Sequence, residues 1–226
     1  MSGAGFYGKL AGRGDFVSRG LPQSFIEPWD AWLAAGMAAS QAELGAGWLD
    51  AYLVSPLWRY AIAPGLLGQD AVIGVVMPSI DRVGRYFPLT IAQLLPADVD
   101  LAGVLGGEEG WFERSEALLL STLEPEADVE AFEQAVQQLA TPPHWPRSAL
   151  TTLGGGLQAS TAATPSARMA LLAQLATEGA SFWWGKGSAA IGAGILRCAG
   201  LPASHAFGRL LVGDNSPGLA QPNWQG

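Results

Sequence analysis

Three consecutive apolar segments, at residues 57–63, 71–77 and 86–95, constrain the fold of this chain more than any other feature. They are rich in β-branched and aromatic residues, which is typical of β-strands. Short turn segments at 64–68 and 78–84 separate them. Because parallel neighbours need a long crossover connection, links this short predict antiparallel pairing. The sequence therefore predicts an antiparallel sheet in this part of the chain.

Further strands are predicted near both ends of the sequence. Residues 5–10 (GFYGKL) form a short apolar segment bounded by glycine and followed by a turn at 12–15. Residues 181–185 and 190–198 are predicted to pair, with 186–188 near their turn. Strands from both ends can join one sheet with helices on its faces. We therefore predict a single α/β domain over residues 1–226 with a mixed, largely antiparallel sheet and an irregular tail at 213–226.

The predicted helices lie between these strands. Apolar residues at helical spacing from Phe25 to Met37 predict the first helix. Pro28 would cost a hydrogen bond inside a helix, so we expect the helix to begin there, after a separate turn at 22–27. A short helix is predicted at 44–53. The remaining helices are predicted near 111–122, 129–139, 164–179 and 202–211.

The helix at 164–179 has the clearest sequence signals. Thr164 offers an N-cap oxygen and Pro165 suits the first helical position. Gly179 can end the helix in the left-handed conformation. The spacing of its large apolar residues predicts that they face the core; these residues are Met169, Leu172 and Leu175.

Composition and charge exclude several classes of protein. The chain has 226 residues, of which 49% are hydrophobic and 14% charged, so a sizeable core is expected. Its net charge of −8 argues against nucleic-acid binding, which needs surplus Lys and Arg, and against attraction to an anionic membrane. Charges at Lys9, Arg13 and Asp15 argue against a signal peptide. The apolar runs are too short to span a membrane. We therefore expect a cytoplasmic protein with no membrane insertion.

Known cofactor and metal motifs do not fit. Residues 3–8 spell GxGxxG but open the chain instead of following a strand, and residues 185–188 lack the spacing of a phosphate loop. The lone Cys198 excludes an internal disulfide and is predicted to be a small core residue. His144 and His205 have no neighbouring ligands. No catalytic, cofactor-binding or metal site is predicted.

Carboxylates are concentrated in one segment. Eleven lie between Asp98 and Glu133, against Arg114 alone. The simpler interpretation is a solvated helix face, and the alternative is a docking surface for a basic partner.

A second set of charged residues lies inside apolar, Gly-rich segments. Such charges must reach water or find a partner, so the set either pins loops together through ion pairs or forms a partner-binding or anion-binding patch at one end of the sheet. A catalytic version of this hypothesis has arginines holding an anion and Asp15 or Asp81 as general base. Asp30 is expected to bond backbone or arginine. The candidate residues are Lys9, Arg13, Asp15, Arg59, Asp81, Arg82, Arg85 and Lys186.

These segments resemble those of a known family. Residues 5–33 (GFYGKLAGRGDFVSRGLPQSFIEPWDAWL) are similar to the opening of TagF proteins, also called the ImpM family. Residues 55–62 (SPLWRYAI) and 77–91 (MPSIDRVGRYFPLTI) resemble the next two blocks of that family, and 181–187 (SFWWGKG) a weaker later one.

The resemblance implies a fold and a function. The fold implied is a three-layer α/β/α sandwich. The function implied is that of a non-enzymatic cytoplasmic regulator of type VI secretion, a post-translational repressor of assembly and firing. Its implied partner is the forkhead-associated scaffold protein of the same system, and no cofactor is implied. The alternatives are an enzyme or small-anion-binding protein that uses the Arg/Asp cluster, and a homodimer that uses exposed Trp residues as anchors.

Overall fold

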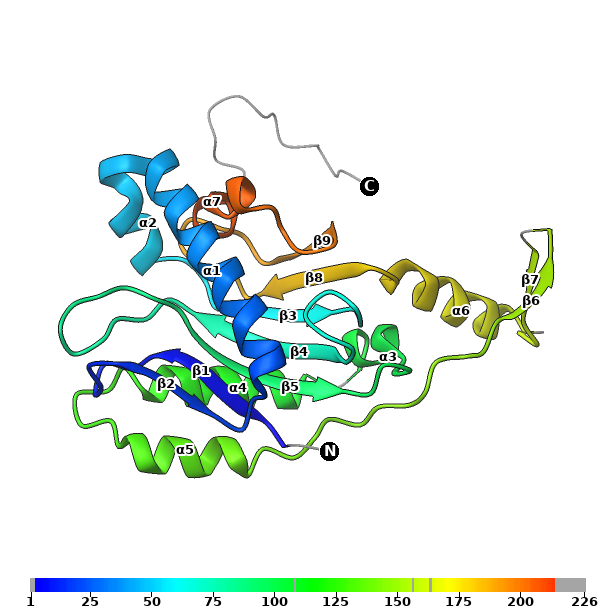
Figure 1. Cartoon of the computed structure of the whole chain (residues 1–226), viewed down its shortest axis with the longest axis horizontal. Helices are drawn as coiled ribbons and strands as arrows, with labels where there is room; N and C mark the ends of the chain where they lie inside the picture. The colour runs from blue at the N-terminus through cyan, green and yellow to red at the C-terminus, as the bar shows by residue number, and fades with distance from the viewer. Residues whose placement is uncertain (1–2, 108, 156, 163, 214–226) are drawn as a thin grey trace.

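A seven-stranded sheet organises the molecule (Figure 1). The computed structural model describes residues 3–107, 109–155, 157–162 and 164–213. The sheet order is β2-β1-β5-β4-β3-β8-β9, and every pairing between these strands is antiparallel, as predicted for the centre of the chain. A parallel contact occurs only as an isolated bridge between Ala180 and Gly200 in the described residues, so the expected mixed sheet is antiparallel instead. The strands are β1 (Gly5–Lys9), β2 (Phe16–Arg19), β3 (Trp58–Ile62), β4 (Ala71–Met77), β5 (Leu89–Leu95), β8 (Ala180–Gly185) and β9 (Gly194–Ala199).

Helices cover both faces of the sheet, so the molecule has three layers, helix–sheet–helix. The prediction of an α/β fold is confirmed. One face carries α1 (Gln23–Leu44), α2 (Trp48–Leu53) and α7 (Gly208–Val212), with short 3-10 turns at Gly45–Gly47 and Ser204–Ala206. The other carries α3 (Leu101–Leu105), α4 (Gly110–Ser121) and α5 (Val129–Gln137).

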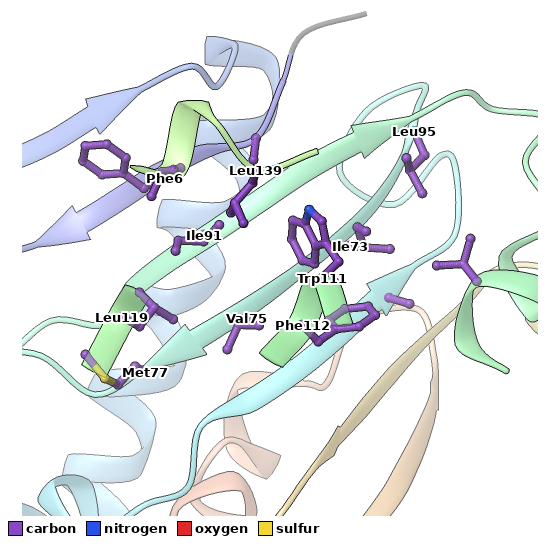
Figure 2. Close-up of a cluster of buried hydrophobic side chains, with 14 of the residues drawn as sticks. Phe6, Ile73, Val75, Met77, Ile91, Leu95, Trp111, Phe112, Leu119 and Leu139 are labelled. Atoms are coloured by element: carbon purple, nitrogen blue, oxygen red, sulfur yellow. The ribbon is translucent and has the colours of Figure 1, made fainter. Parts of the chain in front are cut away.

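A separate hydrophobic core fills each side of the sheet. Under α4, alternate residues of β4 and β5 such as Ile73, Val75 and Ile91 face Trp111 and Phe112 (Figure 2). Under α1 the core is mainly aromatic: the ring centroids of Trp29 and Tyr60 are 4.8 Å apart, and those of Trp32 and Trp183 are 5.1 Å apart. The central strand β4 is buried along its whole length because both faces are covered.

The prediction that the first helix begins at Pro28 is wrong. Helix α1 begins at Gln23 and contains Pro28, which lacks an N–H to donate. The buried face of α1 includes Phe25 and Ile26 before the proline and Trp29 after it. An interior proline costs a helix about 3 kcal/mol, whereas burying each large apolar side chain contributes about 1.5–3 kcal/mol. Burial therefore decides where this helix begins.

Several short elements are not foreseen by the sequence pattern. These are β2, α3 and a hairpin of β6 (Thr151–Gly154) and β7 (Leu157–Ala159) that forms its own two-stranded sheet. Each has only three to five residues, which is too short for a period of 2 or 3.6 to be recognised.

Helix α6 (Pro165–Thr177) confirms the predicted start but not the predicted burial. The Thr164 hydroxyl accepts a hydrogen bond from the backbone N–H of Ala167, and Gly179 has a φ of 60°. Met169 and Leu172 are 65% and 57% exposed, so the prediction that they face the core is wrong. The helix runs past the end of the sheet, and most of its apolar face is left uncovered (Figure 1).

The other end of the chain gives mixed results. Cys198 is only half-buried because β9 is the edge strand of the sheet, so its assignment to the core is wrong. Phe207, Leu210 and Leu211 are buried, as expected for the short helix near 202–211. Residues 214–226 of the predicted tail lie outside the described residues.

Candidate functional site

The candidate charged residues lie at one end of the sheet, at the left in Figure 1. At this end β1 finishes with Lys9, β4 is followed by the loop 78–88, β3 begins next to Arg59, and β8 finishes before Lys186. Antiparallel neighbours alternate in direction, so the end of one strand lies beside the start of the next. Sheet topology therefore brings together residues that are far apart in the sequence.

Asp81 is the centre of the first group. Its side chain has no exposed surface, and its Oδ2 lies 2.5 Å from the Nζ of Lys9 and 2.7 Å from the Nε of Arg85. Its Oδ1 accepts hydrogen bonds from the backbone N–H groups of Val83 and Arg85, at 3.0 and 2.9 Å. Charge-assisted hydrogen bonds of this kind are among the strong ones in proteins. One carboxylate thus binds the end of β1 to the loop after β4.

Further contacts pin the surrounding loops. The Tyr52 hydroxyl of α2 donates to the carbonyl of Ser79 and accepts from its N–H, both at 2.9 Å. The backbone N–H of Arg82 donates to the carbonyl of Arg13 at 3.0 Å. The Arg85 guanidinium also donates to the carbonyl of Gly14. The loops at 10–15 and 79–86 are therefore held as one unit, which we call the loop junction.

Acid is expected to weaken the loop junction. Burial by itself raises the pKa of Asp81, but the hydrogen bonds from Lys9, Arg85 and the backbone outweigh it and hold the pKa far below its usual value. A carboxylate with a lowered folded-state pKa adds stability above its unfolded pKa of about 3.9, and that stability is lost as the pH falls further. We expect the Tm to fall between about pH 4 and pH 2, and less steeply in Asp81→Asn. Thermal unfolding across this range tests it, and parallel profiles for the two proteins would contradict it.

Arg59 and Lys186 form a second group, on the opposite face of the sheet. Alternation along β3 turns Arg59 toward α4, where its guanidinium binds Glu116 through two bonds of 2.6 and 3.0 Å and Glu109 at 2.7 Å. Lys186 lies 3.3 Å from Glu116. Burial raises the pKa of Glu116, but the contacts with Arg59 and Lys186 lower it more. Of the arginines that could have paired with Asp15 or Asp81, Arg59 is therefore excluded, because the strand places it on the other face.

The exposed surface beside the loop junction is hollowed. A depression of about 450 Å³ is lined by Arg13, Asp15, Arg19 and Arg82, among others. Arg19 is paired with Glu133 at 2.8 Å. Arg13 and Arg82 are exposed, and neither has an ion pair among the residues that the structure describes. Their guanidinium groups are the side chains of this site that can still bind a partner's anionic groups.

Some functional contacts have no clear sequence signal. Glu109 and Glu116 belong to the acidic segment interpreted as a solvated face, yet Glu116 is buried against Arg59. Asp30 accepts a hydrogen bond of 2.5 Å from the Tyr7 hydroxyl, and not from backbone or arginine as expected. Burial beside this carboxylate raises the pKa of Tyr7. A contact between residues on different strands or helices depends on the tertiary fold, so the spacing of residues along the sequence does not reveal it.

Comparison with known proteins identifies the family. The family model described as the TagF N-terminal domain, type VI secretion system-associated, matches residues 5–139. The chain belongs to the TagF family. Its fold is also that of a solved structure, the crystal structure of PA0076 from Pseudomonas aeruginosa PAO1, with 67% sequence identity, 99% of each chain covered and a TM-score of 0.93. The comparison with curated proteins found no match.

The TagF model covers the whole loop junction, and it covers the second charged group except for Lys186. Lys9, Arg13, Arg59, Asp81 and Arg82 lie within residues 5–139, whereas Lys186 lies beyond them. In the part of the chain that the structure describes, no helix is long and apolar enough to cross a membrane, and no group of His, Cys, Asp and Glu is arranged to hold a metal ion.

Proposed function

We propose that this TagF protein is a non-enzymatic cytoplasmic regulator of type VI secretion, a post-translational repressor that binds the forkhead-associated scaffold protein of the same system. The observation that carries the proposal is the match to the type VI secretion-associated TagF model over residues 5–139. Repression by binding needs no chemistry: a binder at 100 times its Kd shifts the partner's equilibrium by about 2.7 kcal/mol.

The surroundings of Asp81 and Asp15 favour a binding role for this site over a catalytic one. A general base that works near neutral pH needs a pKa close to that pH. The pKa of Asp81 is lowered instead, and all its close neighbours are donors that keep it ionised. Asp15 is fully exposed and lies 3.8 Å from Arg85. Asp81 is therefore suited to holding the loop junction together, whereas Asp15 is a surface carboxylate with a single distant arginine contact.

We assign the scaffold contact to the surface of Arg13 and Arg82. Charge reversal in the double variant Arg13→Glu/Arg82→Glu is expected to weaken scaffold binding about tenfold or more, which corresponds to about 1.4 kcal/mol. The Tm is expected to change little, because both side chains are exposed and neither forms an ion pair among the described residues. Titration calorimetry with the purified scaffold protein and the full chain measures the affinity.

A charge-matched control separates contact from net charge. Arg114→Glu/Arg197→Glu changes the net charge by the same amount at exposed positions away from the loop junction. We expect this variant to bind the scaffold like the wild type. Equal losses in both variants would place the contact elsewhere, and no binding by the wild-type chain would refute the proposal. Arg85→Glu is unsuitable because it would put a carboxylate against Asp81.

A further inference from the structure

Part of the chain projects from the end of the sheet opposite the loop junction. We call the described residues of 143–177 the arm; it contains β6, β7 and α6. Figure 1 shows the hairpin and most of α6 at the right, beyond the sheet. The hairpin forms a two-stranded sheet apart from the seven-stranded one. Isolated two-stranded hairpins are at best marginally stable in water. The hairpin therefore lacks the support that the strands of the large sheet give one another.

The arm exposes large apolar side chains. Five of them are between 57% and 66% exposed, and they come from the connecting segment, the hairpin and α6. Grouped exposure of this kind marks interaction surfaces. These side chains are Trp145, Leu153, Leu157, Met169 and Leu172.

The charge of the arm is opposite to that of the rest of the chain. No Asp or Glu occurs between Glu133 and Glu178, while Arg147 and Arg168 lie in this stretch. Arg147 lies 3.5 Å from Glu178, just after the arm, and both side chains are more than half exposed. The whole chain has a net charge of −8. The arm is thus an apolar surface with basic residues on an otherwise acidic protein, and it suits an apolar surface with an acidic rim.

The connection between α4 and α5 offers an apolar surface with an acidic rim. A hollow of about 390 Å³ there is lined by apolar side chains, including Leu118 and Phe132, and by three carboxylates. Beside it, Leu120 and Leu123 are 47% and 53% exposed. The three carboxylates are Glu124, Glu126 and Asp128.

We propose that the arm of one copy docks on the α4–α5 hollow of a second copy, and that the second copy's arm does the same in return. The arm and the hollow lie at opposite ends of one molecule, so a chain does not fill its own hollow (Figure 1). Two equal contacts related by a two-fold axis close the assembly as a dimer. An apolar centre with opposite charges at its rim is the usual composition of protein interfaces.

The oligomeric state of the full chain tests the proposal. Sedimentation velocity at increasing concentration is expected to show a reversible dimer. Met169→Glu/Leu172→Glu adds four carboxylates per dimer at acidic, apolar contacts and is expected to raise the dimer Kd at least about tenfold. Leu53→Glu/Val54→Glu is the matched control, with two exposed apolar residues at the end of α2, and is expected to dimerise like the wild type.

A mixing experiment distinguishes this contact from other interfaces. Ala127→Glu/Ala131→Glu places two further carboxylates in the lining of the hollow and leaves the arm intact. Neither damaged variant is expected to dimerise alone, but their mixture recovers one intact contact, between the unchanged arm and the unchanged hollow. A wild-type chain that stays monomeric up to about 100 µM would refute the proposal. Dimers that persist in both variants, or no recovery on mixing, would also refute it.

Discussion

Replacing Asp81 by alanine is expected to lower the Tm by about 10 °C. The variant removes the counter-charge from Lys9, whose side chain is only 6% exposed, and frees the backbone N–H groups of Val83 and Arg85. Breaking one partner of a buried ion pair leaves an uncompensated charge, which is more destabilising than losing the pair as a whole. Differential scanning calorimetry at neutral pH measures the change.

Two controls test the cause of that loss. Asp15→Ala removes a fully exposed carboxylate near the same Arg85 and is expected to change the Tm by at most about 1 °C. Lys9→Met/Asp81→Ala is expected to recover part of the loss, because no buried ammonium is then left unpaired. If Asp81→Ala were as stable as Asp15→Ala, the loop junction would not depend on this carboxylate.

Gly8→Ala is expected to destabilise the protein by more than about 4 kcal/mol. Gly8 has a φ of 137°, a conformation that residues with a side chain rarely adopt. An added Cβ would also meet the Pro88 carbonyl and lie 2.8 Å from the Leu89 Cα, in the backbone of the neighbouring strand. These two backbone atoms cannot move away from the added Cβ without separating β1 from β5. Urea denaturation, with the soluble fraction on expression as a second readout, measures the effect.

The control for Gly8 is another glycine. Gly47 has an ordinary φ of −80°, and a Cβ there would have nothing within 4 Å. Gly47→Ala is therefore expected to leave stability unchanged or to raise it by about 0.4–1 kcal/mol. If the two variants unfolded at the same urea concentration, close strand approach at Gly8 would not limit this fold.

Much of the candidate site follows from the sequence, but its partners do not. A charge in an apolar, Gly-rich segment needs a counter-charge, and this predicts that Asp81 has a cationic partner. Only the structure shows that Arg85 and Lys9 are those partners. The contact of Lys9 with Asp81 spans 72 residues and exists because β1 and β4 flank β5 in the sheet. Glu116 lies among carboxylates that face water, and only the packing of α4 on β3 distinguishes it.

Local patterns determined those parts of the fold that depend on near neighbours in the chain. The central strands follow from β-branched and aromatic residues between short turns, and the start of α6 from Thr164 and Pro165. These features depend on backbone conformation and hydrogen bonds within a few residues. The blocks that resemble TagF can likewise be recognised from the sequence alone, and the family match over residues 5–139 confirms the first three of them.

Only the tertiary structure decided which surfaces are covered. The apolar spacing of α6 is that of a core helix, yet Met169 and Leu172 face water because no element packs over them. Pro28 lies inside α1 because the core beneath that helix extends to both sides of it. Arg59 and Lys9 lie near the same end of the sheet but on opposite faces. Burial depends on what long-range contacts bring against a residue, and periodicity records only that a face is apolar.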